Sequence, residues 1–597
     1  MMKNRSLYRT VVLLLVALML TGLCACGKRS DDPALDALKE GLKNAGEKQE
    51  AQTEADTDEK EPENGKDDEN APDASDTGNA EGLNPEAPDL YGLSDIYVAK
   101  RYDDYYSDQR DLEVDFKYET FYITDELKSA YPELANTLMV INDRIATEEG
   151  HSYRTTLSHL EMQSDAEHQR AMDAGIFPFE EEWEIYVRRA DEDYVSLVTR
   201  HRQASDFDYD AYSYVGCCVD TKTGKEMKLS DFVKDEDALF ALVGEKAYEA
   251  VAPQGGDFVE DGNPIPAQDL AKMIRDSLRD DLSGWTLDPQ GLTFWINSFT
   301  ATPWSYQVSV LFAEDTDGRI FREECKDLIP ERWVMEVPLI DTTYFDAEDD
   351  GKTDQIRIYE LFDYYDDGYR TINAFSINFN EDSLDEDYSE YEAYDFNGML
   401  LHFDNRTVLL EQHNEYDDHF MDLYTLNNGK AKYASYVDAY VETLPYELLS
   451  DEYTVVPRHI PADPANMHLT VYTNLLSTCE SAGDFSITEE GKWVSEDRFY
   501  TILESSRYTI TLKMAIGEVP IVDENTFDVM STKADLKQGD KLTMEYTDGE
   551  SYVDCRTKDG KLVRIYVHDD EELYRSIEIN GKRYGIYDVF EDMMFAG

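Results

Sequence analysis

The residues best suited to bind a cation form one short run at positions 346–354, which reads D-x-E-x-D-G-x-x-D. Alternate carboxylates before a glycine turn can surround a hard cation with oxygen ligands. The pattern makes calcium a candidate, with Asp346, Glu348, Asp350 and Asp354 as its ligands, and a plain solvated turn is the alternative. It is not an EF-hand loop, because the twelfth position holds no glutamate.

A second candidate for chemistry lies near the amino end of the chain. Basic residues precede an apolar run at 11–20, which is too short for a membrane span of about 20 residues. The run ends in Leu23-Cys24-Ala25-Cys26-Gly27, which resembles the lipobox of bacterial lipoproteins. This resemblance implies that Cys26 carries acyl chains that hold the protein on the outer leaflet of the cell membrane. The alternative is an ordinary cleaved signal peptide.

The sequence contains none of the common catalytic motifs. The ten histidines are scattered, and we find no H-E-x-x-H, G-x-S-x-G, Walker or G-x-G-x-x-G motif. We expect no metal site at His413 and His419, which lie in an acidic stretch. The five cysteines after Cys26 lack the dense, regular spacing of a disulfide framework, so we predict buried free thiols. The chain is therefore expected to be no enzyme.

The charge balance limits the class of partner. The chain has 128 acidic and 55 basic residues among 597, a formal net charge of −73. Binding to nucleic acid is excluded, because it depends on clustered lysine and arginine that neutralise phosphates. A basic partner is favoured instead.

Composition and periodicity divide the chain into five parts. Residues 1–26 form the signal peptide with its lipobox, and residues 27–92 are an acidic, low-complexity tether. Over 93–330, strands alternate with helices, including apolar faces at helical spacing, so we predict an α+β domain with helices on an antiparallel sheet. Residues 331–524 have short strand patterns typical of a β-rich domain. Over 525–597, the dipeptides Asp-Gly and Asn-Gly predict tight hairpins and a small SH3-like β-barrel.

One string within residues 93–330 resembles a known family. It runs from Asp220 through Thr223 and Gly224 to Leu229, Asp231 and Phe232, with weaker matches at residues 131–142 and 291–295. Together these resemble the RsiV-like extracytoplasmic domain, a domain of unknown function shared by a Gram-positive anti-sigma factor and some peptidoglycan deacetylases. The resemblance covers about residues 95–320. It implies binding of lysozyme, as the ectodomain of the anti-sigma factor does.

The chain differs from that family in ways that exclude some of the family's functions. The histidine that the family often carries before this string is replaced here by the run 215–218, Val-Gly-Cys-Cys. We expect no anti-sigma activity, since no cytoplasmic domain precedes the signal peptide, and no deacetylase activity, since the chain has no H-x-x-x-H pair. The resulting hypothesis is a non-catalytic cell-surface lipoprotein that binds an extracellular ligand such as lysozyme. The alternatives are a cell-wall enzyme, or its accessory subunit, acting on peptidoglycan or another glycan, and a surface spacer.

Overall fold

A computed structural model describes residues 96–595, apart from gaps at 103–104, 107–111, 163–178, 205–210, 252–258, 261–262, 281, 298–304, 365–369, 388–392, 416–417, 442–457, 462, 496–497 and 571–573. The predicted lipid-anchored Cys26 and the tether at 27–92 lie outside these residues. Among the described residues, no helix combines the length and apolar character that a membrane crossing requires.

The first sheet has seven strands and joins distant parts of the chain. Its path is β21-β1-β3-β4-β5-β6, with β2 paired to β3, and only the β3–β4 pairing is parallel. The strands are Ile96–Tyr102 (β1), Tyr105–Tyr106 (β2), Leu112–Tyr122 (β3), Phe179–Ala190 (β4), Tyr194–Ala204 (β5), Ala211–Asp220 (β6) and Arg458–Ile460 (β21).

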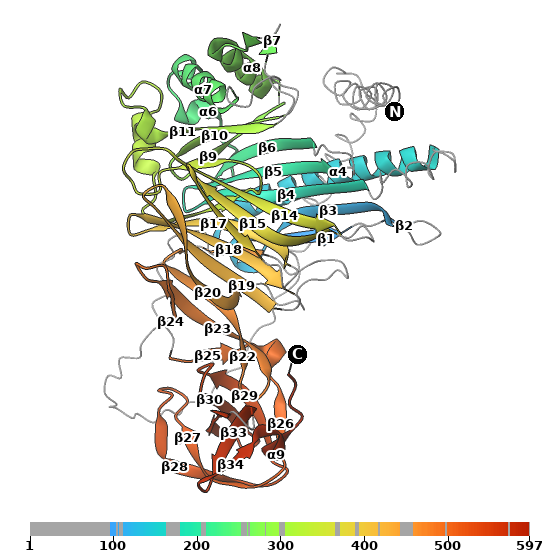
Figure 1. Cartoon of the computed structure of the whole chain (residues 1–597), viewed down its shortest axis with the longest axis vertical. Helices are drawn as coiled ribbons and strands as arrows, with labels where there is room; N and C mark the ends of the chain where they lie inside the picture. The colour runs from blue at the N-terminus through green and yellow to red at the C-terminus, as the bar shows by residue number, and fades with distance from the viewer. Residues whose placement is uncertain are drawn as a thin grey trace, which may run out of the picture. The chain divides into compact units, whose positions relative to one another are not determined.

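Two helices follow β3, namely Asp125–Ala130 (α3) and Pro132–Met162 (α4). The long helix α4 lies along this sheet (Figure 1). Its buried residues Leu134, Leu138, Ile141 and Ile145 recur at helical spacing, which confirms the apolar face predicted from the sequence. They pack in one cluster with residues of the sheet and of strands beyond residue 330, including Met399.

The second layer consists of a three-stranded sheet and the helices that cover it. The strands are Gly284–Asp288 (β9), Gly291–Ile296 (β10) and Tyr306–Leu311 (β11). The helices are Leu229–Phe232 (α6), Glu236–Val251 (α7) and Ala267–Arg279 (α8), which lie beside that sheet (Figure 1). Smaller elements are the pair Val259–Glu260 (β7) and Asn263–Pro264 (β8), and the 3-10 helices Phe312–Glu314 (η2) and Glu323–Leu328 (η3).

The remaining chain is almost entirely β. A path of twenty strands comprises Trp333–Val337 (β12), Thr343–Phe345 (β13), Asp354–Tyr364 (β14), Arg370–Phe379 (β15), Asp382–Asp387 (β16), Ala393–Phe403 (β17), Arg406–Glu415 (β18), Asp418–Asn427 (β19), Lys430–Val441 (β20), Asn466–Asn474 (β22), Thr478–Ile487 (β23), Trp493–Ser495 (β24), Tyr500–Ile502 (β25), Thr509–Leu512 (β26), Ile516–Val522 (β27), Val529–Leu536 (β28), Lys541–Thr547 (β29), Tyr552–Thr557 (β30), Leu562–Tyr566 (β31) and Phe590–Glu591 (β35). A separate sheet contains His568–Asp570 (β32), Tyr574–Ile579 (β33) and Lys582–Gly585 (β34), next to the helix Ile586–Val589 (α9), and the 3-10 helix Glu504–Ser506 (η5) precedes β26.

The predicted fold class is therefore wrong. Strands make up 53% of the structure and helices are few, so the chain is mostly β rather than α+β followed by β modules. The described residues form open sheets, and the C-terminal strands do not close into an SH3-like barrel. The predicted turns are nevertheless present, because Gly549, Gly560 and Gly581 all have positive φ between paired strands. A tight turn fixes a hairpin, but it does not decide which sheet the hairpin joins.

A buried ion pair connects three of the strands. Arg188 on β4 is 0% exposed and binds both carboxylate oxygens of Asp288 on β9, through Nη2 at 2.7 Å and Nε at 3.3 Å. Its Nη1 donates to the backbone oxygen of Glu336 on β12 at 2.7 Å. The hydroxyls of Thr286 and Thr293 complete the shell around Asp288 at 2.9 and 2.7 Å. These bonds satisfy both charges, as burial requires.

Candidate functional site

The family-like string begins with a tight turn that docks on helix α4. Asp220 accepts hydrogen bonds at Oδ1 from the backbone and the hydroxyl of Thr223, both at 2.8 Å. Gly224 has a φ of +63°, and a Cβ at this position would lie 2.4 Å from the backbone oxygen of Glu133. Thr137 donates to the Gly224 oxygen at 2.7 Å. Glycine is therefore required here both by its backbone conformation and by the close approach of α4.

The second half of the string forms helix α6. Asp231 accepts a hydrogen bond from the Lys228 backbone at 2.9 Å, which caps this short helix. Phe232 is buried against the three-stranded sheet, and its backbone oxygen accepts from the Arg322 amide at 3.0 Å. Leu229 packs half-buried against the same cluster. The structure thus gathers these residues into one turn and one helix, where each has a clear role in folding.

An open hollow of about 410 Å³ lies where α6 meets α7. It is strongly polar, and its lining comprises Ser230, Val233, Lys234, Asp235, Glu236, Asp237, Arg275 and Arg322. Asp235 caps helix α7 by accepting from the Ala238 amide at 3.0 Å. At the rim of the hollow, the guanidinium of Arg275 donates hydrogen bonds to Asp237 at 2.6 Å and to Glu236 at 3.1 Å. These two carboxylates already bind a cationic group at the surface.

The predicted calcium loop lies between β13 and β14. Asp346 is mostly buried, and its carboxylate accepts from the backbone amides of Asp350 at 3.0 Å and Gly351 at 2.7 Å. Burial raises the pKa of Asp346, although these two bonds oppose the shift. Asp354 accepts from the Ala347 amide at 3.0 Å. Both carboxylates therefore shape the turn itself.

The other two predicted ligands of this loop also bond to protein groups. Glu348 accepts from the Asn428 amide at 3.2 Å, and Asp350 pairs with Lys352. The lysine side chain lowers the pKa of Asp350. None of the four belongs to the group of convergent ligand atoms found within the described part of the chain. Calcium binding by this loop stays a prediction.

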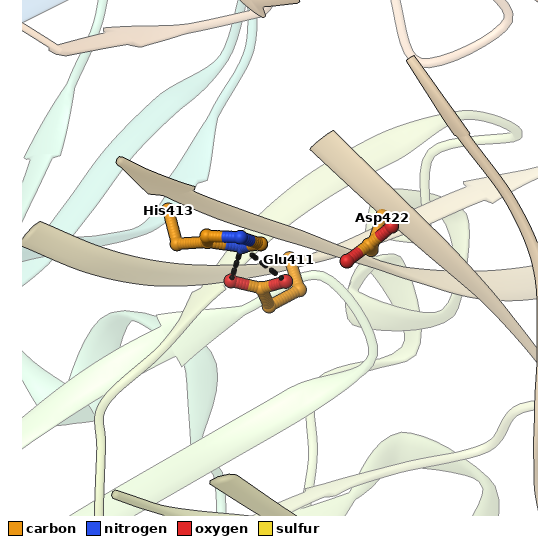
Figure 2. A group of neighbouring side chains, drawn as sticks. All are labelled: Glu411, His413 and Asp422. Carbon is orange, nitrogen blue, oxygen red and sulfur yellow. Dashed lines mark hydrogen bonds and ion pairs between the residues drawn. The ribbon is translucent and has the colours of Figure 1, made fainter. Parts of the chain in front are cut away.

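That convergent group comprises Glu411, His413 and Asp422 (Figure 2), whose potential ligand atoms all lie within 4.8 Å of one another. Glu411 and His413 are two residues apart on β18 and so share a face, while Asp422 on β19 pairs directly with Glu411. His413 Nδ1 lies 2.9 and 3.0 Å from the two oxygens of Glu411. The ring of Phe420 stacks on His413, with its centroid 5.5 Å away.

Sequence reasoning missed this group. In the sequence, His413 lies near His419 in an acidic stretch, for which no metal site is predicted. The available signal was the spacing of Glu411 and His413, since residues two apart on a strand point to the same side. Asp422 joins them only through the strand register, which local sequence does not reveal.

The cysteine prediction is confirmed for the described part of the chain. Cys217, Cys218, Cys325, Cys479 and Cys555 are all buried and unbridged. Burial raises the pKa of Cys217 and of Cys479 to about 12 in each case. Such thiols remain protonated at neutral pH and are poor nucleophiles.

Two solved structures are similar to part of the chain, at low sequence identity. No family model and no curated protein matches the chain. Two solved structures match at 13% identity, over 40% of this chain and 98% of theirs. They are a DUF3298 family member from Bacteroides fragilis NCTC 9343, with a TM-score of 0.27, and a DUF3298 family protein from Pseudomonas aeruginosa PAO1, with a TM-score of 0.22. The chain thus has DUF3298 proteins among its structural neighbours, at low coverage and identity, and the RsiV-like assignment stays a prediction.

Proposed function

We propose that the chain is a lipid-anchored protein of the cell surface that binds a cationic protein without chemical turnover. The RsiV-like resemblance suggests lysozyme as that ligand and Cys26 as the anchored residue. The observation that supports the proposal is the pair Glu236 and Asp237, which hold the guanidinium of Arg275 at the rim of the hollow. Their side chains are 44% and 86% exposed, so an incoming arginine or lysine can reach them.

The net charge would speed the encounter with a basic protein, whereas the hollow would help to distinguish one basic protein from another. A formal charge of −73 attracts any basic protein at low salt. At physiological ionic strength, that attraction is screened beyond about 8 Å. Discrimination between basic proteins must therefore come from short-range contacts. The exposed carboxylates of Glu236 and Asp237 in the lining of the hollow are our candidates for these contacts.

The test compares two double variants that remove the same charge. The variant Glu236→Gln/Asp237→Asn is expected to weaken binding of lysozyme to the full chain by about tenfold at physiological salt, because exposed charge pairs contribute modestly. The control variant Glu518→Gln/Asp559→Asn removes two exposed, lysine-paired carboxylates from the C-terminal strands. Its affinity should match that of the unmodified chain. Equal losses in both variants would show that net charge alone drives binding, and the proposal would fail.

A further inference from the structure

We propose that Glu411, His413 and Asp422 form a binding site for a divalent transition metal, with zinc as the best fit. The site is independent of the cationic ligand proposed above, since it lies on strands β18 and β19 and includes no residue of the hollow. It is also separate from the predicted calcium loop, which contributes none of the three ligands.

The ligand set matches the chemistry of zinc. Zinc binds imidazole nitrogen and carboxylate oxygen at about 2.0–2.2 Å, and sites with three protein ligands keep a fourth position for water. An imidazole among the ligands favours zinc over calcium or magnesium, which prefer oxygen ligands only. Glu411, His413 and Asp422 supply one nitrogen and two carboxylates from two adjacent strands.

The distances require only a small contraction. Ligand atoms around a tetrahedral zinc lie about 3.3 Å apart, as follows from the bond lengths. The corresponding atoms here lie within 4.8 Å of one another, so a side-chain movement of about 1 Å brings them to bonding distance. Figure 2 shows the Asp422 carboxylate directed toward the other two side chains. Asp422 is only half-buried, which leaves its side chain room to move.

The existing contacts orient the imidazole. The Nδ1 of His413 and the carboxylate of Glu411 already face each other, at 2.9 and 3.0 Å from the two oxygens. A metal shared with Glu411 must lie on the Nδ1 side of the ring, so Nδ1 is the nitrogen that would bind it. Stacking against Phe420 limits rotation of the ring. The Glu411 oxygens that face Nδ1 would then bind the same metal, which takes the place of the proton between the two side chains.

Two members of the group are buried beside an apolar cluster. Glu411 is 0% exposed and His413 is 2% exposed. Leu409 and Tyr424, which lie on the same face of β18 and β19, belong to an apolar cluster with Ile358 and Phe375. A divalent cation bound here would be shared by two carboxylates and one imidazole. Charge interactions are strong in such a low-dielectric environment.

The experiment uses the full chain, freed of metal with a chelator and then titrated with zinc chloride in excess calcium. Calcium occupies the many surface carboxylates, so that only sites selective for zinc are counted. We expect one zinc per chain by elemental analysis, and a visible d–d spectrum typical of tetrahedral coordination when cobalt replaces zinc. His413→Gln should lower zinc affinity by about 100-fold and Asp422→Asn by about tenfold. Zinc should also raise the melting temperature of the unmodified chain.

The matched control is His468→Gln. His468 also bonds a carboxylate, that of Asp484, at 2.7 Å, but this pair is about half exposed and joins no convergent group of three among the described residues. Zinc binding should be unchanged in this variant. The proposal is overturned if the unmodified chain binds no zinc, or if all variants bind it equally. If His413→Gln does not fold, Asp422→Asn decides the matter, because a half-buried residue tolerates that change.

Discussion

Substitution of Arg188 by methionine should loosen the junction between β4, β9 and β12. The guanidinium makes two hydrogen bonds to Asp288, one to the backbone of Glu336 and one to the Thr343 hydroxyl. Methionine fills a similar volume but offers no donor. Asp288, which is 3% exposed, would keep only its two threonine donors and become a buried charge without a cationic partner.

The expected cost follows from that geometry. Removing one partner of a buried ion pair destabilises by about 3–5 kcal/mol, because the other charge stays uncompensated. Asp288→Asn alone should be costly for the converse reason, since it leaves Arg188 charged. The double variant Arg188→Met/Asp288→Asn removes both charges, and its cost should fall short of the sum by about 2 kcal/mol or more.

Amide hydrogen exchange is the suitable assay, because a chain with several sheets need not unfold in one step. A loss of about 3–5 kcal/mol accelerates exchange in β4, β9 and β12 by about 100- to 4000-fold. Arg279→Met serves as the matched control, since Arg279 pairs with Asp276 on an exposed helix surface. The reasoning is refuted if Arg188→Met exchanges within about threefold of the unmodified chain, or if the two single effects are additive in the double variant.

Three further predictions follow from local geometry. Gly224→Ala should destabilise the turn by about 1–3 kcal/mol or more, because it combines a φ of +63° with a close contact to Glu133. Gly351→Ala, whose φ is +79° in open space, should cost less, and amide hydrogen exchange in the two turns measures both changes. Asp315 is buried, which raises its pKa, but three backbone amides that donate to it outweigh burial and lower the pKa overall. Its stabilising effect is therefore complete above the unfolded value of about 3.9 and lost as the pH falls through the folded value. Asp315→Asn should thus destabilise at pH 7 and match the unmodified chain at low pH, and a constant difference across this range would contradict the assignment. Cys217 and the other buried cysteines should react with a thiol reagent only after unfolding, and rapid labelling of the native chain would show that they are accessible.

Local features of this chain could be predicted from its sequence, whereas their assembly could not. The apolar face of α4 and the hairpin turns at Gly549, Gly560 and Gly581 depend on short-range periodicity and on the glycine conformation, and both were found. The predominance of β structure was not predicted, because the helical patterns between residues 93 and 330 are local signals that do not show how many residues enter the sheets. Pairing of β1 with β21 depends on residues far apart in the sequence, which no local pattern indicates.

In the candidate sites too, local spacing could be predicted from the sequence, whereas the contacts between distant residues could not. The carboxylates of the loop at 346–354 were identified from their spacing, but their use as acceptors for the turn's own amides depends on the folded backbone. The group formed by Glu411, His413 and Asp422 depends on the register between β18 and β19. A shift of that register by one residue would move Asp422 to the opposite face of the sheet. Spacing along one strand therefore identifies two members of the group at most.

The most direct test of the proposed function is to measure binding of the full chain, solubilised in detergent, to a c-type lysozyme over a series of salt concentrations. Cytochrome c, which is similarly basic, is the control. We predict that lysozyme binding persists at physiological salt while cytochrome c binding is lost, because short-range contacts survive screening and long-range attraction does not. Equal, weak binding of both proteins that disappears with added salt would contradict the proposal, since net charge would then account for all of the affinity.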